Sequence, residues 1–143
     1  MTGKQHLTTQ DYPLAEKRPD LVRTRHGKKL EDLTLAGIEA GEVALEDLRI
    51  APEALRQQAE IAVAAGRPTL ARNFELAAEL IDVPQDVILS IYELLRPGRA
   101  KGKGDLIDAA NLLRGTYKAE RMAAFIEEAA AVYERRGLFS KRF

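Results

Sequence analysis

Apolar residues recur every three or four positions in three consecutive segments of the chain, which begin at Pro52, Pro68 and Pro84. This spacing places them on one face of an α-helix. Proline suits the first turn of a helix, because its missing N–H would have no intrahelical partner there. Gly66 and Pro97 end the first and third segments. The pattern predicts three helices of similar length, joined by short connections and packed as antiparallel or steeply crossed neighbours.

The predicted core faces of these helices consist of aliphatic residues and one phenylalanine. In chain order they are Leu55, Ala59, Ala62 and Val63, then Leu70, Phe74, Ala77, Ala78 and Ile81, then Val87, Ile88, Ile91, Leu94 and Leu95. The small side chains of Ala77 and Ala78 would allow another helix to approach closely.

A second helical region is predicted from Asp105 to about Arg136. Its apolar positions form two stripes, which are Leu106, Ile107, Ala110 and Leu113, followed by Met122, Phe125, Ile126, Ala129, Val132 and Tyr133. Gly115 and Thr116 lie between the stripes and weaken the helix. The pattern leaves open whether the helix is kinked or fully broken there. Gly137 is a suitable C-terminal stop.

Residues 1–29 contain prolines and polar runs that predict an irregular N-terminal arm. Such an arm either lays its few apolar side chains on a surface or frays, and composition alone slightly favours fraying. Residues 30–50 predict short helices or turns, with Thr34 as an N-cap and Asp47 at a turn. No stretch alternates with a period of two for long enough to form a strand. We therefore predict an all-α protein, a compact bundle of short helices in one domain over 30–143, preceded by the arm.

The chain of 143 residues carries 22 basic and 22 acidic side chains, so its formal net charge is zero. It therefore has no electrostatic reason to bind nucleic acid or an anionic membrane. The absence of cysteine excludes disulfides, thiol catalysis and thiolate metal sites. No apolar run approaches the ~20 residues of a membrane span. Because the N-terminus also has no apolar signal core, we expect a cytoplasmic protein.

Candidate reactive groups are scarce. His6 and His26 have no carboxylates at metal-binding spacing and are expected to be solvated. The stretch GRAKGKGD at 98–105 has neither the spacing nor the hydroxyl of a phosphate-binding loop and reads as a flexible basic linker. Glu127 and Glu128 are adjacent, so on a helix they point about 100° apart and do not converge on a substrate. We therefore assign no catalytic, cofactor-binding or metal-binding residue.

The stretch ARNFELAAEL at 71–80 favours partner binding over catalysis. Arg72 and Asn73 lie off the apolar stripe, where a guanidinium and an amide could bind the backbone or the carboxylates of another chain. A non-catalytic assembly subunit therefore fits better than an enzyme. The alternative is a helical nucleic-acid-binding or regulatory module, suggested by RPGRAKGKG at 96–104. Neutral charge and few aromatic residues count against it, and a stand-alone lyase would lack an acid–base pair.

Several ordered segments of the sequence carry a family resemblance. They are DYPLA at 11–15, LEDLTL at 30–35, GEV at 41–43, LRI with PEALRQQA within 48–59, QAEIAVAAGRPTLARNFELAAELIDVPQDVILSIYELLRPGR at 58–99 and AAFIEEAAAVYER at 123–135. Together they extend from about Asp11 to Arg136. They closely resemble the small subunit of adenosylcobalamin-dependent diol and glycerol dehydratases.

The resemblance implies a mostly helical chain in a heterohexamer with two copies each of a large, a medium and a small subunit. In that family a TIM barrel of the large subunit holds the diol and a cation, and adenosylcobalamin lies between the large and medium subunits. Homolysis of the cobalt–carbon bond starts a radical reaction that eliminates water and gives an aldehyde. The chain would thus be a non-catalytic subunit of a carbon–oxygen lyase, bound to the large subunit and holding no cofactor by itself.

Under this resemblance we expect partner contacts at Tyr12, Pro13 and Leu14 in the arm, and at Arg72, Asn73 and Arg96 in the helices. Some diol dehydratase small subunits carry a longer N-terminal extension linked to encapsulation in a bacterial microcompartment. Only about ten residues precede DYPLA here, without an amphipathic pattern, so the sequence gives encapsulation through this chain no support. A glycerol-type or unencapsulated enzyme is the expectation that follows.

Overall fold

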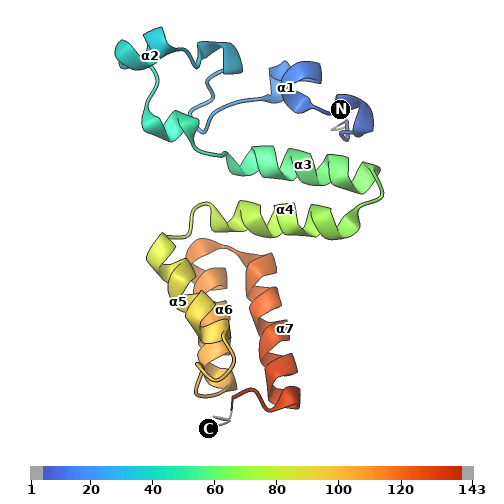
Figure 1. Cartoon of the computed structure of the whole chain (residues 1–143), viewed down its shortest axis with the longest axis vertical. Coiled ribbons are helices and arrows are strands. Elements are labelled where there is room, and N and C mark those ends of the chain that lie inside the picture. The colour runs from blue at the N-terminus through green and yellow to red at the C-terminus, as the bar shows by residue number, and fades with distance from the viewer. Residues whose placement is uncertain (1–4, 140–143) are drawn as a thin grey trace. The chain divides into compact units, whose positions relative to one another are not determined.

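The computed structural model describes residues 5–139, which form an all-α structure (Figure 1). Within that range the one β feature is an isolated antiparallel bridge between Arg23 and Lys29. The helices are α1 (Leu14–Lys17), α2 (Leu35–Glu39), α3 (Pro52–Ala64), α4 (Pro68–Leu80), α5 (Gln85–Leu95), α6 (Lys103–Tyr117) and α7 (Glu120–Arg136). Short 3₁₀ helices are η1 (Thr9–Asp11), η2 (Pro19–Leu21), η3 (Leu30–Asp32) and η4 (Leu45–Leu48). The all-α prediction is confirmed.

Internal packing divides the chain into two compact units, Met1–Ile81 and Asp82–Phe143. The predicted arm therefore belongs to the first unit and contains the short helical turns η1, α1 and η2. The division into an arm over 1–29 and one domain over 30–143 stays a prediction, and its ends at 1–4 and 140–143 lie outside the described residues. No helix within 5–139 combines the length and the apolar character needed to cross a lipid bilayer.

The first unit is built on the hairpin of α3 and α4, whose ribbons run side by side in Figure 1. Gly66 makes the turn with a φ of +72°, a conformation that suits glycine. The helices meet through Ala59, Ala62 and Ala71, with Leu70 and Phe74 packed against them. Because alanine projects so little, the two backbones approach closely.

Two residues differ from the predicted faces of this hairpin. Ala77 is exposed because the buried stripe of α4 runs through Ala71, Phe74 and Ala78, at spacings of three and four residues. Val63 is 61% exposed, and Ile61, which was not predicted, is buried instead. Ile61 is buried and Val63 is not, because α3 packs on two sides, against α4 and against the arm.

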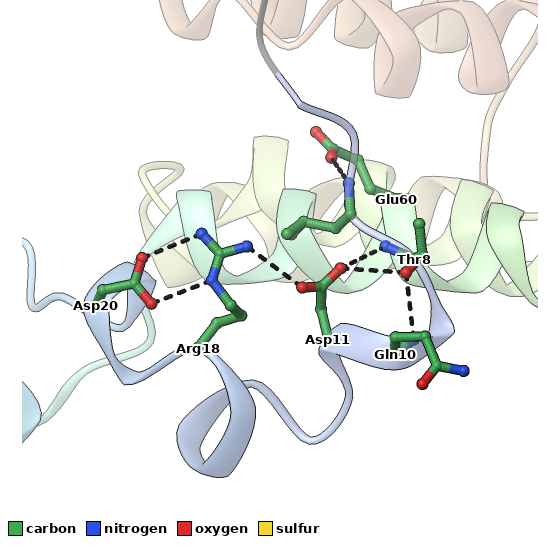
Figure 2. A network of polar contacts seen from close by, with 7 residues as sticks. Thr8, Gln10, Asp11, Arg18, Asp20 and Glu60 are labelled. Atoms are coloured by element: carbon green, nitrogen blue, oxygen red, sulfur yellow. Dashed lines mark hydrogen bonds and ion pairs between the residues drawn. The ribbon is translucent and has the colours of Figure 1, made fainter.

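The arm is fastened to α3 by one apolar cluster and one hydrogen bond. Leu7 and Leu14 are buried against Ile61, and Leu21 with Val22 packs on the same cluster. The backbone N–H of Leu7 donates to Glu60 Oε2 at 3.1 Å (Figure 2).

Polar contacts fix the arm internally. Asp11 accepts from the Thr8 backbone N–H at 2.8 Å and from Arg18 at 3.2 Å, and Arg18 also holds Asp20 (Figure 2). The Thr8 N–H and the Arg18 guanidinium lower the pKa of Asp11 below its ordinary value. The arm is therefore ordered on the surface of α3. This is the first of the two arrangements that the sequence left open, and it differs from the fraying that composition alone slightly favours.

A buried carboxylate organises the segment before α3. Asp47, in η4, has a side chain that is 1% exposed, and it accepts hydrogen bonds from the Ala44 N–H and the Thr24 hydroxyl, each at 2.9 Å. His26 Nδ1 lies 2.9 Å from the same carboxylate. The backbone hydrogen bond from Ala44 is the main reason that the pKa of Asp47 is lowered, with Thr24 and His26 adding to it. Thr34 caps α2 as predicted, accepting from the Gly37 N–H at 3.0 Å.

The second unit centres on the hairpin of α6 and α7, with α5 alongside α6. Its largest fully buried side chains are Leu106, Leu113 and Ile126. The open question near Gly115 is answered by a full break three residues later, where Lys118 adopts a left-handed conformation with a φ of +56°. The Ala119 N–H then returns to the carbonyl of Leu113 at 2.9 Å.

Ion pairs and hydrogen bonds join the helices of this unit. Arg114 on α6 makes a two-pronged ion pair with Glu127 on α7, at 2.7 and 3.0 Å, and lowers the pKa of that carboxyl. The Tyr133 hydroxyl donates to the carbonyl of Leu95. The predicted stop at Gly137 is confirmed by its φ of +65°. Phe125, predicted to be in the core, is 39% exposed, and Ala123 and Ala130 are buried instead.

The adjacent leucines of α6 provide a test of the second core. Leu113 is 1% exposed and Leu112 is 42% exposed. We expect Leu113→Ala to lower the free energy of unfolding by about 2–5 kcal/mol, because it leaves a cavity. Leu112→Ala should cost less than about 1 kcal/mol. Urea denaturation followed by circular dichroism measures both, and equal losses would contradict the core assignment.

The buried carboxylate predicts a pH dependence. Because the folded state lowers the pKa of Asp47, its charge stabilises the fold above about pH 4, and this contribution is lost as the pH falls through the lowered pKa. Asp47→Asn should therefore be less stable than the natural chain at about pH 7, and the difference should shrink toward about pH 3. Urea midpoints across this range test it. A difference that does not change with pH would contradict the role of the charge.

Candidate partner-binding site

A groove lies between the arm and α3 in the first unit. It encloses about 660 Å³, and apolar side chains, including Leu14, Leu21, Val22 and Ala54, line part of it. The groove exists because Leu7 and Leu14 dock on Ile61 and hold residues 21–25 beside the N-terminal half of α3.

The charged part of the groove lining is mostly basic. Arg23, Arg25 and Arg56 line it with one acidic residue, Glu53. The guanidinium of Arg56 lies 3.9 Å from Glu53, a distance at which an exposed pair contributes little. A surface of this kind, apolar with arginines beside it, is suited to bind a polypeptide segment that brings apolar and acidic side chains.

Tyr12 lies between this groove and a second hollow. Its side chain is 58% exposed and also lines a hollow of about 300 Å³ with Leu70 and Phe74 of α4. An exposed tyrosine with apolar hollows on both sides is typical of a side chain that packs against another protein.

The structure brings only part of the predicted contact set together. Tyr12, Pro13 and Leu14 all line the groove, and Leu14, at 6% exposure, has most of its surface against this chain's own core. Arg72 and Asn73 are exposed on α4 but line neither hollow. Arg96 belongs to the second unit, where it pairs with Glu93 at 3.0 Å.

Sequence reasoning missed the basic side of the groove. Arg23 and Arg25 lie in the segment predicted to be irregular, and Arg56 lies at a polar position of α3. No local spacing connects them, because packing between segments about thirty residues apart brings them together. The sequence held one signal of the groove, which is the group of apolar residues in the arm. Such residues pack against another surface when the protein folds.

The histidines and carboxylates of residues 5–139 are spread over the fold. Within residues 5–139 there is no group of three or more histidine, aspartate and glutamate side chains that could hold a metal ion. His6 is exposed. His26 is also exposed, as predicted, but it is bonded to Asp47, a contact that its sequence position does not reveal.

In the second unit, the basic stretch at 98–105 is partly helical. Helix α6 begins at Lys103, and the Lys101 N–H donates to Asp105 at 2.8 Å. Asp105 also lines a hollow of about 430 Å³ between α5 and α6, with Ile91, Leu94 and Leu112. The prediction of a flexible linker is thus wrong for the last residues of the stretch.

Large apolar side chains remain at the surface of both units. Within the described part of the chain they are Tyr12, Leu30, Leu35, Ile38, Leu45, Leu48, Ile50, Val63, Leu89, Tyr92, Leu112 and Phe125. Half of them come from residues 30–50. Isolated exposed apolar residues are common, but a concentration of this kind indicates a surface that a partner covers.

Comparison with known proteins decides the family. A family model described as dehydratase small subunit matches residues 7–140. The chain belongs to this family. It is 52% identical to the propanediol dehydratase small subunit of Citrobacter freundii over 126 residues. This match spans 88% of the present chain and 73% of that protein. It is 50% identical over 126 residues to the propanediol dehydratase small subunit of Salmonella typhimurium, covering 88% and 72% respectively. The resemblance found from the sequence is confirmed.

Proposed function

We propose that this chain is the non-catalytic small subunit of an adenosylcobalamin-dependent diol dehydratase in the cytoplasm. It binds and stabilises the large subunit in an assembly that contains two copies each of a large, a medium and a small subunit. The assembled enzyme converts a 1,2-diol to an aldehyde and water. Membership of the dehydratase small subunit family over residues 7–140 carries this proposal.

The substrate we propose for the assembly is propane-1,2-diol. Both similar proteins are named as propanediol dehydratase small subunits and are at least half identical to this chain over 126 residues. The pocket that would distinguish propane-1,2-diol from glycerol belongs to another subunit in this proposal. A comparison of the two substrates with the assembled enzyme therefore tests this part separately from the assembly itself.

The chemistry rests with the larger subunits in this proposal. Adenosylcobalamin, when bound there, supplies the radical that makes elimination of water feasible. The present chain contributes binding surface. Its groove offers apolar side chains and guanidinium groups, which suit recognition of a polypeptide.

The partner contacts we propose are Tyr12, Pro13 and Leu14 at the groove, with Arg72, Asn73 and Arg96. The exposure of Tyr12 and its place between two apolar hollows support the first group. Arg72 and Asn73 are supported by their exposure on α4, where they can donate hydrogen bonds to another chain.

The proposal predicts the outcome of co-purification. When the tagged chain is co-expressed with the large and medium dehydratase subunits of its source, all three should purify together. The complex should dehydrate propane-1,2-diol only with added adenosylcobalamin. The chain alone should show no turnover.

Two outcomes would contradict the proposal. The first is purification of the chain without the other subunits under conditions in which they fold. The second is salt-dependent binding of duplex DNA by the free chain, which would favour the nucleic-acid-binding alternative.

The predicted contacts can be tested by substitution. Tyr12→Ala and Arg72→Ala should each weaken binding of the large subunit by roughly tenfold, because truncating an interface tyrosine or arginine commonly costs more than about 1 kcal/mol. Helicity should not change. Tyr92→Ala and Arg135→Ala, at exposed positions of the second unit, serve as matched controls. Unchanged affinity in both test variants would show that these contacts are assigned wrongly.

A further inference from the structure

The segment 30–50 combines exposed leucines and isoleucines with a strong local negative charge. Residues 30–50 read LEDLTLAGIEAGEVALEDLRI, with six acidic residues and one basic residue, Arg49, in a chain whose net charge is zero. Leu35 and Leu45 are each 71% exposed, and Ile50 is 63% exposed. We call residues 30–50 the acidic leucine segment.

The acidic leucine segment is shaped mainly by polar contacts. Thr34 caps α2, Asp32 accepts from the Lys29 N–H at 3.0 Å, and Asp47 is held by Ala44, Thr24 and His26. None of the extensive contacts between helices in the described chain involves α2. The exposed leucines of the segment therefore do not form a hydrophobic core within this chain.

The backbone of the segment is nevertheless closely fitted. A Cβ placed on Gly37 would meet Val43 Cγ2 at 3.1 Å and the Asp32 carbonyl oxygen at 3.2 Å. Val43 is buried, and its N–H donates to the Gly37 carbonyl at 3.2 Å. Apolar side chains thus project from an ordered frame, which lowers the conformational entropy that a binding partner would have to remove.

The charge of the segment selects its partner. Two copies of the chain meeting through this surface would bring like charges together, which disfavours self-association here. Anionic membranes and nucleic acids are disfavoured for the same reason. A protein surface with lysines or arginines around apolar pockets fits both properties. At the ends of the segment, Glu31 lies 3.8 Å from Lys29 and Glu46 lies 3.6 Å from Arg49. Glutamates of the segment can therefore form ion pairs with basic side chains.

We infer that the acidic leucine segment is a docking surface for a basic, apolar patch on the large dehydratase subunit, distinct from the groove beside α3. This inference rests on the proposed function for the identity of the partner. Leu35 and Leu45 insert into the apolar part of that patch. Glu39 and Glu42, near the middle of the segment, face its lysines and arginines.

The apolar part of the inference is tested with Leu35→Ser and Leu45→Ser in the full chain. Each should weaken binding to the large subunit at least tenfold, measured by titrating the purified chain against the complex of large and medium subunits. Val63→Ser, at an apolar position of α3 that is 61% exposed, is the matched control and should change the affinity less than twofold. Equal weakening by Val63→Ser would overturn the assignment to this segment.

The electrostatic part is tested with Glu42→Lys against Asp86→Lys, which changes the net charge equally at an exposed position of α5. Glu42→Lys should weaken binding at least tenfold and reduce its dependence on salt. Asp86→Lys should change it less than threefold. Identical behaviour of the two variants would overturn the charge complementarity.

Failure of the proposed function and failure of the docking surface give different experimental results. If the natural chain does not bind the larger subunits, the proposed function is wrong and this inference falls with it. If the natural chain binds and the leucine and glutamate variants bind equally well, only the docking surface is wrong. Dimerisation of the free chain that Leu45→Ser abolishes, measured by analytical ultracentrifugation, would overturn the choice of partner.

Discussion

Close packing of alanine between helices is the interaction on which both units depend. Eleven of the twenty buried apolar residues within 5–139 are alanines. In the first unit they line the contact of α3 with α4, and in the second Ala109, Ala110, Ala123 and Ala130 are buried on α6 and α7. Alanine gives close helix contact at little cost in side-chain entropy, but each residue buries little apolar surface.

Because these cores consist largely of alanine, large apolar side chains remain available to contact another protein. The first unit adds few large residues to its core, mainly Leu7, Leu14 and Ile61, where the arm meets α3. The leucines of residues 30–50 stay at the surface instead. A monomer that must be soluble alone would be expected to bury more of them, so this distribution accords with a chain that completes its burial in an assembly.

Local signals made much of the fold predictable from the sequence. Pro52 and Pro68 mark the first residues of α3 and α4, and Gly137 ends α7, because each residue acts through its own backbone. The buried faces were less predictable. A single stripe assigned Val63 to the core, whereas α3 has two partners and buries Ile61.

The candidate site was predictable only in part for the same reason. Tyr12 was identified through a family motif, but Arg23, Arg25 and Arg56 meet beside it only after the arm has docked on α3. His26 and Asp47 are also far apart in the sequence. The path of the chain before α3 brings them into contact. Such contacts depend on tertiary packing, which residue spacing does not contain.

The central claim is that the first unit uses its exposed apolar surface to bind the larger dehydratase subunits. Hydrogen–deuterium exchange of the chain, free and in complex with those subunits, tests it most directly. The account predicts that complex formation slows exchange at residues 30–50 and around Tyr12, while the buried turns of α6 and α7 change little. Unchanged exchange at 30–50 in a complex that has formed would contradict it.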